Sequence, residues 1–555
     1  GESCFENCEN LTDINCESCK TIGNSCFKNC EQLKSVILNT NSDRIIGEYA
    51  FYNNKSLIEF DANGIQEIKS STFENCESLE LVKNINWNEL NSGSEEIYLK
   101  IINSKAFKNC SKLQFSSVES DKNNYNLSYV LEIGYEAFMN TPVKNFIASK
   151  VSKIDKNVFN GCSTTDNQIS INLSGLKEFL DNSNNQNIVG YFEGLYINEL
   201  IFGDIELTTN IFDKIISIQS LKTETSSQIT SNNLPNIISK CIGIKTFIAN
   251  NLNLIPSTTF TNNKTIEHVE CELIEQMGDS SYNGAFENCT NLIDIKMSNV
   301  KRILESSFKN CTSLIRIDIS NCNKISNNAF ESCTNLINAI MTVKYIGDSV
   351  FKDCSSLQNV VLNGDIEMIG ESAFENCSKL HTFNINGTFQ THDPNDITKK
   401  IDTEIKNNTF KNCYNLQNIN GFDNVVKYGN SAFSNTGITT ITLSSNNVTI
   451  GNETFKGSKI KTISNCRSII SIGTGAFQNA INLINFTANS LLMELPTYAF
   501  ENCSSLEEIY LSGCTKNNCS FIGCSKLKNI LFAILDFSSN IYAYDKYTGN
   551  ITTLR

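Results

Sequence analysis

The chain has 555 residues, 40% of them hydrophobic, so it is long enough to bury a large core. Its net charge of −14 disfavours nucleic-acid binding and docking on anionic lipid, because both require clustered Lys and Arg. The three histidines, His268, His381 and His392, leave little material for acid–base or metal chemistry near neutral pH.

The first ten residues, GESCFENCEN, read as the middle of a repeat unit. They have neither the basic start nor the apolar stretch of a signal peptide. We therefore expect them to belong to a longer chain, with any leader or anchor outside the residues given. No run of 18 apolar residues occurs, so we also expect no membrane span within them.

A unit of about 22 residues recurs along the chain. From Phe286 to Phe374 its anchor phenylalanines follow one another at spacings of 22, 22, 21 and 23 residues. Each stands in the pattern A-F-x-x-C-x-x-L-x-x-I-x-L, often after I-G, as at Ile346-Gly347. We count 20 clear units, with anchors at Phe5, Phe27, Phe51, Phe73, Phe107, Phe138, Phe159, Ile238, Phe260, Phe286, Phe308, Phe330, Phe351, Phe374, Phe410, Phe433, Phe455, Phe477, Phe500 and Phe521. Phe192 and Phe212 mark two degraded units.

Each unit predicts one strand and one turn of a coil. L-x-x-I-x-L ends in the period-two alternation of a half-buried strand. We expect Leu314, Ile317 and Ile319 to point inward and the residues between them, Arg316 and Asp318, to point outward. The phenylalanine should fill the opposite wall from a short irregular or 3-10 segment. Glycines such as Gly347 and Gly370 are expected to permit the turn between the two walls.

Stacked units predict a repeat solenoid. One unit is too small to fold alone, and only stacking covers both of its faces. The expected fold is therefore a leucine-rich repeat with one long parallel β-sheet on one face and short irregular or 3-10 segments on the other. We divide it into repeats with insertions (1–162), degenerate repeats at a bend or seam (163–237), further repeats (238–532) and a C-terminal cap or linker (533–555).

The 23 cysteines follow the repeat. Fourteen stand three residues after the anchor phenylalanine, in a slot that elsewhere holds Asn, Thr, Ser or Ala. Such a slot selects for small size, so we expect a ladder of buried thiols that touch the backbone. Less favoured alternatives are a metal at Cys16-x-x-Cys19, which matches half a zinc knuckle, and one disulfide among Cys514, Cys519 and Cys524. We predict no metal, no cofactor and no catalytic residue, since no catalytic motif appears.

The Phe–Cys–Leu spacing, with its preceding I-G, resembles the BspA-like, Treponema-type leucine-rich repeat over nearly the whole chain. The resemblance implies a non-enzymatic adhesion or protein-interaction solenoid at the cell surface. Its partner would be a host, matrix or neighbouring-cell protein or glycan, and self-association is a further option. The alternative is a cytoplasmic scaffold within a large assembly, which the many free thiols would suit.

Two sets of surface residues follow from this interpretation. Solenoids bind through the exposed positions of the sheet, and consecutive exposed apolar residues at Ile293, Ile315 and Ile337 suggest a contact stripe beside them. The predicted binding residues are Asp294, Lys296, Arg316, Asp318, Asn338, Gln358, Asn359, His381, Asn384 and Gln417. N-x-S/T sequons make candidate glycosylation sites of Asn54, Asn126, Asn172, Asn447, Asn452 and Asn485. Sequons of the form N-C-S/T lie inside the repeat and are weaker candidates.

Overall fold

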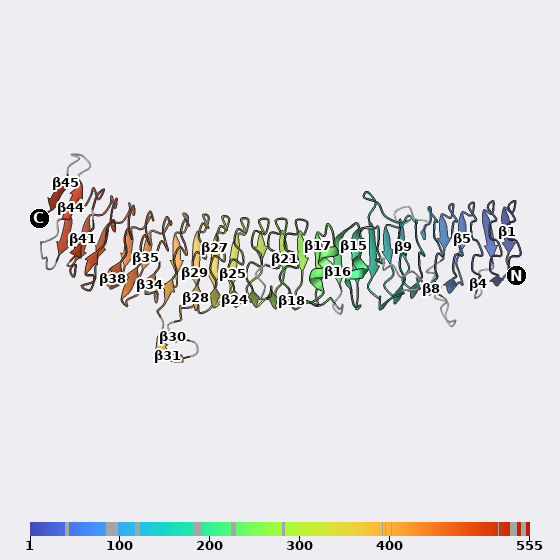
Figure 1. Ribbon diagram of the computed structural model, residues 1–555, viewed down its shortest axis with the longest axis horizontal. Coiled ribbons are helices and arrows are strands. Elements are labelled where there is room, and N and C mark those ends of the chain that lie inside the picture. Colours follow the sequence, from blue (N-terminus) through green and yellow to red (C-terminus); the bar gives the residue numbers. More distant parts are fainter. Residues whose placement is uncertain are drawn as a thin grey trace. The chain divides into compact units, whose positions relative to one another are not determined.

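The computed structural model describes residues 1–38, 44–84, 98–116, 123–180, 190–223, 229–279, 284–390, 392–393, 396–400, 402–514, 516–519, 521–532, 541–544 and 551–554. Two compact units account for them: residues 1–252 with 269–271, and residues 253–268 with 272–555. Each unit is a stack of coils with short strands and little helix (Figure 1). The predicted seam at 163–237 therefore falls inside the first unit, whose continuous part runs to Leu252.

In the first unit, two ladders of parallel strands run along the coils. The longer strands come from the L-x-x-I-x-L segments and are β1 (Asp13–Cys16), β3 (Ser35–Leu38), β5 (Glu59–Asp61), β7 (Leu81–Lys83), β9 (Asn124–Asn126), β11 (Asn145–Ile147), β13 (Ile169–Leu173), β15 (Tyr196–Phe202), β16 (Ser217–Thr223) and β17 (Thr246–Ala249). The shorter strands precede the phenylalanine turns and are β2 (Thr21–Ile22), β4 (Ile45–Ile46), β6 (Glu67–Ile68), β8 (Ile101–Ile102), β10 (Glu132–Ile133), β12 (Lys153–Ile154) and β14 (Glu178–Phe179).

The second unit repeats this arrangement. Its longer strands are β21 (Asp294–Lys296), β23 (Arg316–Ile317), β25 (Asn338–Met341), β27 (Asn359–Leu362), β29 (Thr382–Ile385), β33 (Asn418–Asn420), β35 (Thr440–Thr442), β37 (Thr462–Ser464), β39 (Asn485–Thr487), β41 (Glu508–Leu511) and β43 (Asn529–Phe532). Its shorter strands are β18 (Leu254–Ile255), β20 (Gln276–Met277), β22 (Arg302–Ile303), β24 (Lys324–Ile325), β26 (Tyr345–Ile346), β28 (Met368–Ile369), β32 (Glu404–Ile405), β34 (Lys427–Tyr428), β36 (Val448–Ile450), β38 (Ile469–Ile472), β40 (Glu494–Leu495) and β42 (Lys516–Asn517). Residues of β19 (His268–Glu270) belong to both units.

The remaining elements depart from the coil pattern. α1 (Leu234–Lys240) and the 3-10 turns η1 (Thr209–Phe212) and η2 (Cys466–Ser468) are the helical segments of the described residues. An antiparallel hairpin, β30 (His392–Asp393) and β31 (Asp396–Lys400), projects away from the coils of the second unit (Figure 1). A second hairpin, β44 (Ile541–Tyr544) and β45 (Ile551–Leu554), falls in the predicted cap or linker, of which 533–540, 545–550 and 555 lie outside the described residues.

The longer strands confirm the predicted parallel pairing. Equivalent residues of successive coils lie side by side, as Asn359 does with Thr382 and Leu362 with Ile385. The ladder is interrupted where strands shorten: between β23 and β25 the single bridge joins Ile319 to Met341. Leu314 and Ile319 are fully buried as expected, whereas Ile317, in the two-residue strand β23, is only half-buried.

The phenylalanine segment is a regular series of turns. Ser306 and Asn310, two residues on either side of Phe308, have left-handed backbones with φ of 55° and 60°. Because left-handed residues recur along this segment, every second backbone N–H points to the next coil. The N–H of Phe308, for example, donates to the carbonyl oxygen of Ala329 at 2.8 Å. Asparagine tolerates the left-handed region because its amide can bond locally. Here the Asn310 amide donates to the Asn288 side-chain oxygen of the preceding coil at 2.7 Å.

The phenylalanine rings form a stacked column inside each unit. The Phe308 ring lies 5.4 Å from Phe286 and 5.2 Å from Phe330 between centroids, with interplanar angles of 3° and 4°. All three side chains are fully buried. Each ring therefore covers the faces of its neighbours, which is why no coil is stable alone.

The thiol slot links adjacent coils. Cys311 donates its S–H to the carbonyl oxygen of Phe286 at 3.1 Å, and Cys333 donates to Phe308 at 3.1 Å. Where the slot holds Thr436, the hydroxyl donates within its own coil, to Phe433 at 2.8 Å. The expected ladder of buried thiols touching the backbone is confirmed, and its bonds run from one coil to the one before.

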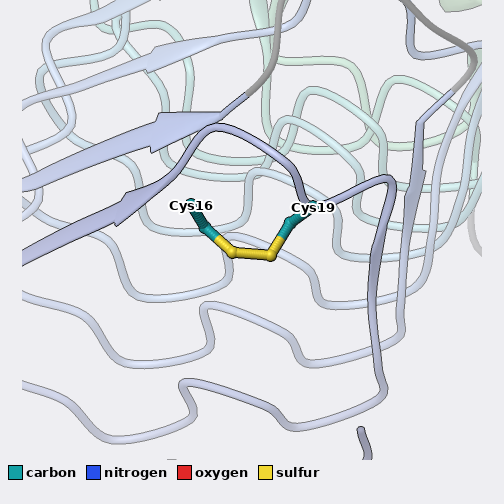
Figure 2. Close-up of a disulfide and its surroundings, with 2 residues drawn as sticks. All are labelled: Cys16 and Cys19. Atoms are coloured by element: carbon teal, nitrogen blue, oxygen red, sulfur yellow. A yellow bond between two sulfur atoms is a disulfide. The ribbon is translucent and has the colours of Figure 1, made fainter.

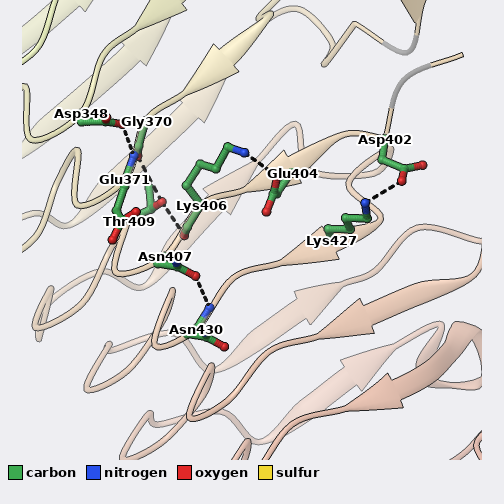
Figure 3. A network of polar contacts seen from close by, with 10 residues as sticks. All are labelled: Asp348, Gly370, Glu371, Asp402, Glu404, Lys406, Asn407, Thr409, Lys427 and Asn430. Carbon is green, nitrogen blue, oxygen red and sulfur yellow. Dashed lines mark hydrogen bonds and ion pairs between the residues drawn. The ribbon is translucent and has the colours of Figure 1, made fainter. Parts of the chain in front are cut away.

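The corner after the short strand has a further polar ladder, shown around Gly370 in Figure 3. The Asp348 carboxylate accepts the N–H of Glu371 at 2.7 Å, and the Asn407 side-chain oxygen accepts the N–H of Asn430 at 2.8 Å. The Thr409 hydroxyl lies 3.4 Å from the Gly370 carbonyl oxygen. Backbone groups that a tight corner would leave unpaired are thus satisfied by side chains of the neighbouring coil.

One pair of cysteines is not a repeat feature. Cys16 and Cys19, at the end of β1, form a disulfide across a tight turn (Figure 2). A metal at this pair would need both thiolates, whereas the structure pairs the two sulfurs with each other. Within the part of the chain that the structure describes, no disulfide joins Cys514, Cys519 or Cys524, and all three side chains are buried.

Candidate recognition surface

The predicted sheet residues lie together on the outer side of β21 to β29. We call Asp294, Lys296, Arg316, Asp318, Asn338, Asn359 and Asn384 the strand face. All are exposed except Asn384, which is half-buried. The alternation that buries Ile295 and Ala339 turns their neighbours outward, so local sequence alone positions this face.

Cross-strand bonds hold several of these side chains in place. The Asn359 amide donates to the Asn338 side-chain oxygen at 3.0 Å, and the Asn420 amide donates to Asn384 at 2.8 Å. Farther along, His268 Nδ1 lies 2.8 Å from the Asp294 carboxylate. Side chains fixed in this way lose less entropy when a ligand binds, which favours a preorganised binding surface.

A second line of residues lies where the chain enters each strand. We call Ile293, Ile315, Ile337, Gln358, His381 and Gln417 the entry stripe. Consecutive members are joined through the backbone: Gln358 donates to Ile337 at 2.8 Å and His381 to Gln358 at 2.9 Å. Ile293 and Ile315 are 37% and 39% exposed, so an apolar end grades into a polar one. The predicted Gln358, His381 and Gln417 thus belong with the isoleucines rather than with the strand face.

Sequence reasoning missed outward apolar residues on the longer strands. Ile340 is 51% exposed on β25, beside Asn338, and Tyr510 is 38% exposed on β41. The signal was available, because both residues stand at outward positions of the period-two pattern. The face therefore presents amides and isolated large apolar groups together, a combination found at protein interfaces.

The chemistry of the interior gives no support for catalysis. No group of three metal-ligating side chains occurs among the residues that the structure describes. Burial raises the pKa of Cys76, Cys241 and Cys289 from 9.0 to about 12. Thiols in this state are poor nucleophiles and poor ligands, because both roles need the thiolate.

The same pKa shifts predict loss of stability at alkaline pH. Unfolded thiols ionise near pH 9, whereas the buried ones keep their protons to about pH 12, so the folded state binds more protons in between. The free energy of unfolding should be fully retained below pH 9 and should fall as the pH rises toward 12. Urea titrations at pH 7.5, 9 and 10.5, followed by circular dichroism, would measure this. A Cys311→Ala/Cys333→Ala/Cys354→Ala variant should show a shallower fall; an identical slope would assign the effect to other groups.

The candidate glycosylation sites differ in how accessible their asparagine side chains are. Asn54 is fully buried in the thiol slot, where its oxygen accepts the Cys30 N–H at 2.8 Å, so the folded coil leaves no room for a glycan there. The amides of the N-C-S/T sequons are engaged in the asparagine ladder, as at Asn109 and Asn310. The remaining candidate sites are exposed, apart from the half-buried Asn172; they are Asn126, Asn172, Asn447, Asn452 and Asn485.

Comparison with known proteins assigns the repeat to a family. The family model of the BspA type leucine rich repeat region matches residues 1–114, 83–183, 279–395, 395–507 and 448–552, together more than half of the chain. No curated protein matches. Across the described residues, no helix is both long and apolar enough to cross a membrane.

Solved structures with similarity to the chain include three bacterial leucine-rich repeat proteins. The one from Bacteroides ovatus ATCC 8483 is 20% identical, covers 50% of this chain and 82% of its own, and gives a TM-score of 0.31. A leucine rich cell surface protein from Faecalibacterium prausnitzii A2-165 is 18% identical, with coverages of 51% and 83% and a TM-score of 0.28. The T. pallidum leucine rich repeat protein is 21% identical, with coverages of 33% and 74% and a TM-score of 0.22.

Proposed function

Because the chain belongs to the BspA-type leucine-rich repeat family, we propose that it is a non-enzymatic recognition solenoid of the cell surface. It binds a protein or glycan of a host, a matrix or a neighbouring cell. The binding residues are those of the strand face and the entry stripe. Proteins built from leucine-rich repeats generally bind proteins, and no group of three potential metal ligands occurs in the described part of this chain.

One observation carries the proposal: exposed isoleucines of two adjacent coils adjoin charged strand-face residues, and amides that are paired across strands follow in the next coils. Ile293 and Ile315 lie beside charged strand-face residues, and the Asn338–Asn359 pair follows two coils on. A solvated face has no need of consecutive exposed aliphatic side chains, since monomers rarely expose continuous apolar area without a binding role. The mixture of apolar anchors and fixed polar groups supports a protein or glycan partner.

The cysteines are compatible with an extracellular location. Free thiols are rare outside the cell when they are accessible, but here most are buried, and many of these donate a hydrogen bond to the backbone, as Cys311 does. The Cys16–Cys19 disulfide fits an oxidising compartment. We expect glycans on exposed Asn447, Asn452 and Asn485 in that case. Peptide mass mapping before and after enzymatic deglycosylation would detect them.

A pair of matched variants tests the surface. Ile315→Arg/Asn338→Arg adds two charges to the entry stripe and the strand face. Asn253→Arg/Asn323→Arg adds the same charge at exposed positions beside the short strands β18 and β24. We expect the first variant to lose at least tenfold in binding to plates coated with fibronectin, laminin or collagen and to fixed epithelial cells, and the control to keep it. Equal loss in both would exclude this surface.

Location is tested separately. Antibodies against the chain should stain intact, unpermeabilised cells of its source. Staining that appears only after permeabilisation would favour the alternative, an intracellular scaffold. Sedimentation of the purified chain at several concentrations would then show whether it self-associates. A scaffold requires such binding between copies of the chain.

A further inference from the structure

A groove lies beyond the entry stripe, on the coils that contain β35 to β43. It has a volume of about 310 Å³ and is lined by eight residues, including Lys459, Lys461, Asn482, Ser505, Glu507 and Lys526. The line of strand entrances continues here: Lys461 donates its N–H to Thr439 at 2.7 Å, and Glu507 donates to Ile484 at 2.8 Å. The groove thus runs along the stack, across several coils.

The groove is positively charged in a chain whose net charge is −14. Lys459, Lys461 and Lys526 are exposed, and none forms an ion pair with another described residue. The acidic lining residue Glu507 is neutralised by Lys528 at 3.0 Å. Several other lysines of the repeat are paired between coils, as Lys309 is with Glu331 at 2.8 Å. Three unpaired lysines in one groove are therefore available to an anionic ligand.

We propose that this groove binds a linear acidic polysaccharide through its sulfate or carboxylate groups. Lys459 and Lys526 stand at comparable places three coils apart, which at about 4.8 Å per coil is about 14 Å. A single small anion cannot span that distance, whereas a chain with repeated charges can. Between the lysines, Asn482 and Ser505 offer an amide and a hydroxyl, the groups that bond sugar hydroxyls.

The groove is poorly suited to an acidic peptide. One common way to hold an extended peptide is by main-chain hydrogen bonds to a free strand edge. Here the N–H groups of Lys461, Ile484 and Glu507 are already used between coils. Side-chain donors remain, and these favour a ligand rich in hydroxyl and anionic groups. Single-stranded nucleic acid is disfavoured as well, because no aromatic side chain lines the groove for bases to stack on.

The inference does not depend on the proposed function. The groove residues are distinct from the strand face and the entry stripe, so loss of one binding activity leaves the other measurable. Arg variants at Ile315 and Asn338 should leave polysaccharide binding unchanged. Conversely, the groove variant should retain binding to any ligand of the strand face that lacks acidic sugar.

A charge-matched pair of variants tests the groove. Lys459→Gln/Lys461→Gln/Lys526→Gln removes the three unpaired lysines. Lys34→Gln/Lys144→Gln/Lys344→Gln removes three exposed lysines elsewhere and gives the same net charge. Binding of fluorescein-labelled dextran sulfate fragments is measured by anisotropy at 50 and 200 mM salt, with neutral dextran and a polyglutamate peptide of similar length as comparison probes.

We expect the groove variant to bind dextran sulfate at least tenfold more weakly and the control variant to bind within twofold of the unchanged chain. Binding should weaken with salt, since exposed charges are screened. The proposal is overturned by no binding of dextran sulfate, by equal loss in the control, or by equal binding of neutral dextran. Polyglutamate that binds as tightly, with the same sensitivity to the groove variant, would replace the polysaccharide by an acidic peptide.

Discussion

Replacement of Phe308 by alanine is expected to lower the local free energy of unfolding by about 3–5 kcal/mol. The ring is fully buried and stacks on Phe286 and Phe330, so its removal leaves a cavity and exposes both neighbouring rings. Coils of a solenoid contact only their neighbours, and the damage should therefore be confined to nearby units. Amide hydrogen exchange read by mass spectrometry should lose protection between residues 286 and 351 and keep it between 433 and 500.

Two changes act as controls for Phe308. Phe5→Ala removes the same anchor where the side chain is 45% exposed, and should cost no more than about 1 kcal/mol. Cys311→Ser keeps the small slot of the same coil but exchanges the bond to Phe286 for one within the coil, as at Thr436, and should also cost about 1 kcal/mol. Damage from Cys311→Ser equal to that from Phe308→Ala would contradict a purely packing role for the thiol.

The sequence predicted the features that act within one coil. Phe308, Leu314 and Ile319 are buried because a single unit must place its large apolar side chains inward, and that demand is visible in each repeat. The small slot at Cys311 was recognised for the same reason. The strand face followed from period-two alternation, and its members, such as Asn338 and Asn359, are exposed where expected.

What the sequence did not predict depends on contacts between coils. Tyr345–Ile346 forms a strand of only two residues, too short to show any alternation, and its partners are Lys324 and Ile325 in the preceding coil. The left-handed turn at Asn310 is recognisable only once its amide is seen to reach Asn288. Such bonds join residues about 22 positions apart. The sequence pattern within one unit therefore does not predict them.

The lysine groove was missed for a related reason. Lys459, Lys461 and Lys526 come from different units, and each alone looks like ordinary solvated surface. Only the stack shows that they line one groove, whereas Lys309, for example, is paired with Glu331 of the next coil. Alignment of the units by their anchors, with charges followed from coil to coil, would have found the cluster.

Gly370 is a position where the expected explanation was wrong. The sequence suggested that Gly347 and Gly370 serve a turn that other residues cannot adopt, yet neither has a left-handed backbone. The reason is the close approach of adjacent coils. A Cβ added at Gly370 would lie 2.4 Å from the carbonyl carbon and oxygen of Gly347 and 2.5 Å from the nitrogen of Asp348.

Gly370→Ala should therefore lower the free energy of unfolding by about 3 kcal/mol, at the upper end of the usual cost of overpacking, because the obstacle is backbone. The coil cannot shift without breaking the Gly370 N–H bond to Ile346 at 2.9 Å and the Asp348–Glu371 bond beside it. Urea unfolding of Gly370→Ala against the unchanged chain measures the loss.

Gly475→Ala provides the contrast. Its φ of 62° costs an alanine about 1 kcal/mol, but no atom lies closer than 3.6 Å to the added Cβ. If close approach is what fixes the glycine of each I-G corner, Gly370→Ala must be clearly the more damaging of the two, although Gly370 has the ordinary backbone. Equal effects would mean that coils can move apart at this corner, and the ladder of Figure 3 would then be too weak to hold them in register.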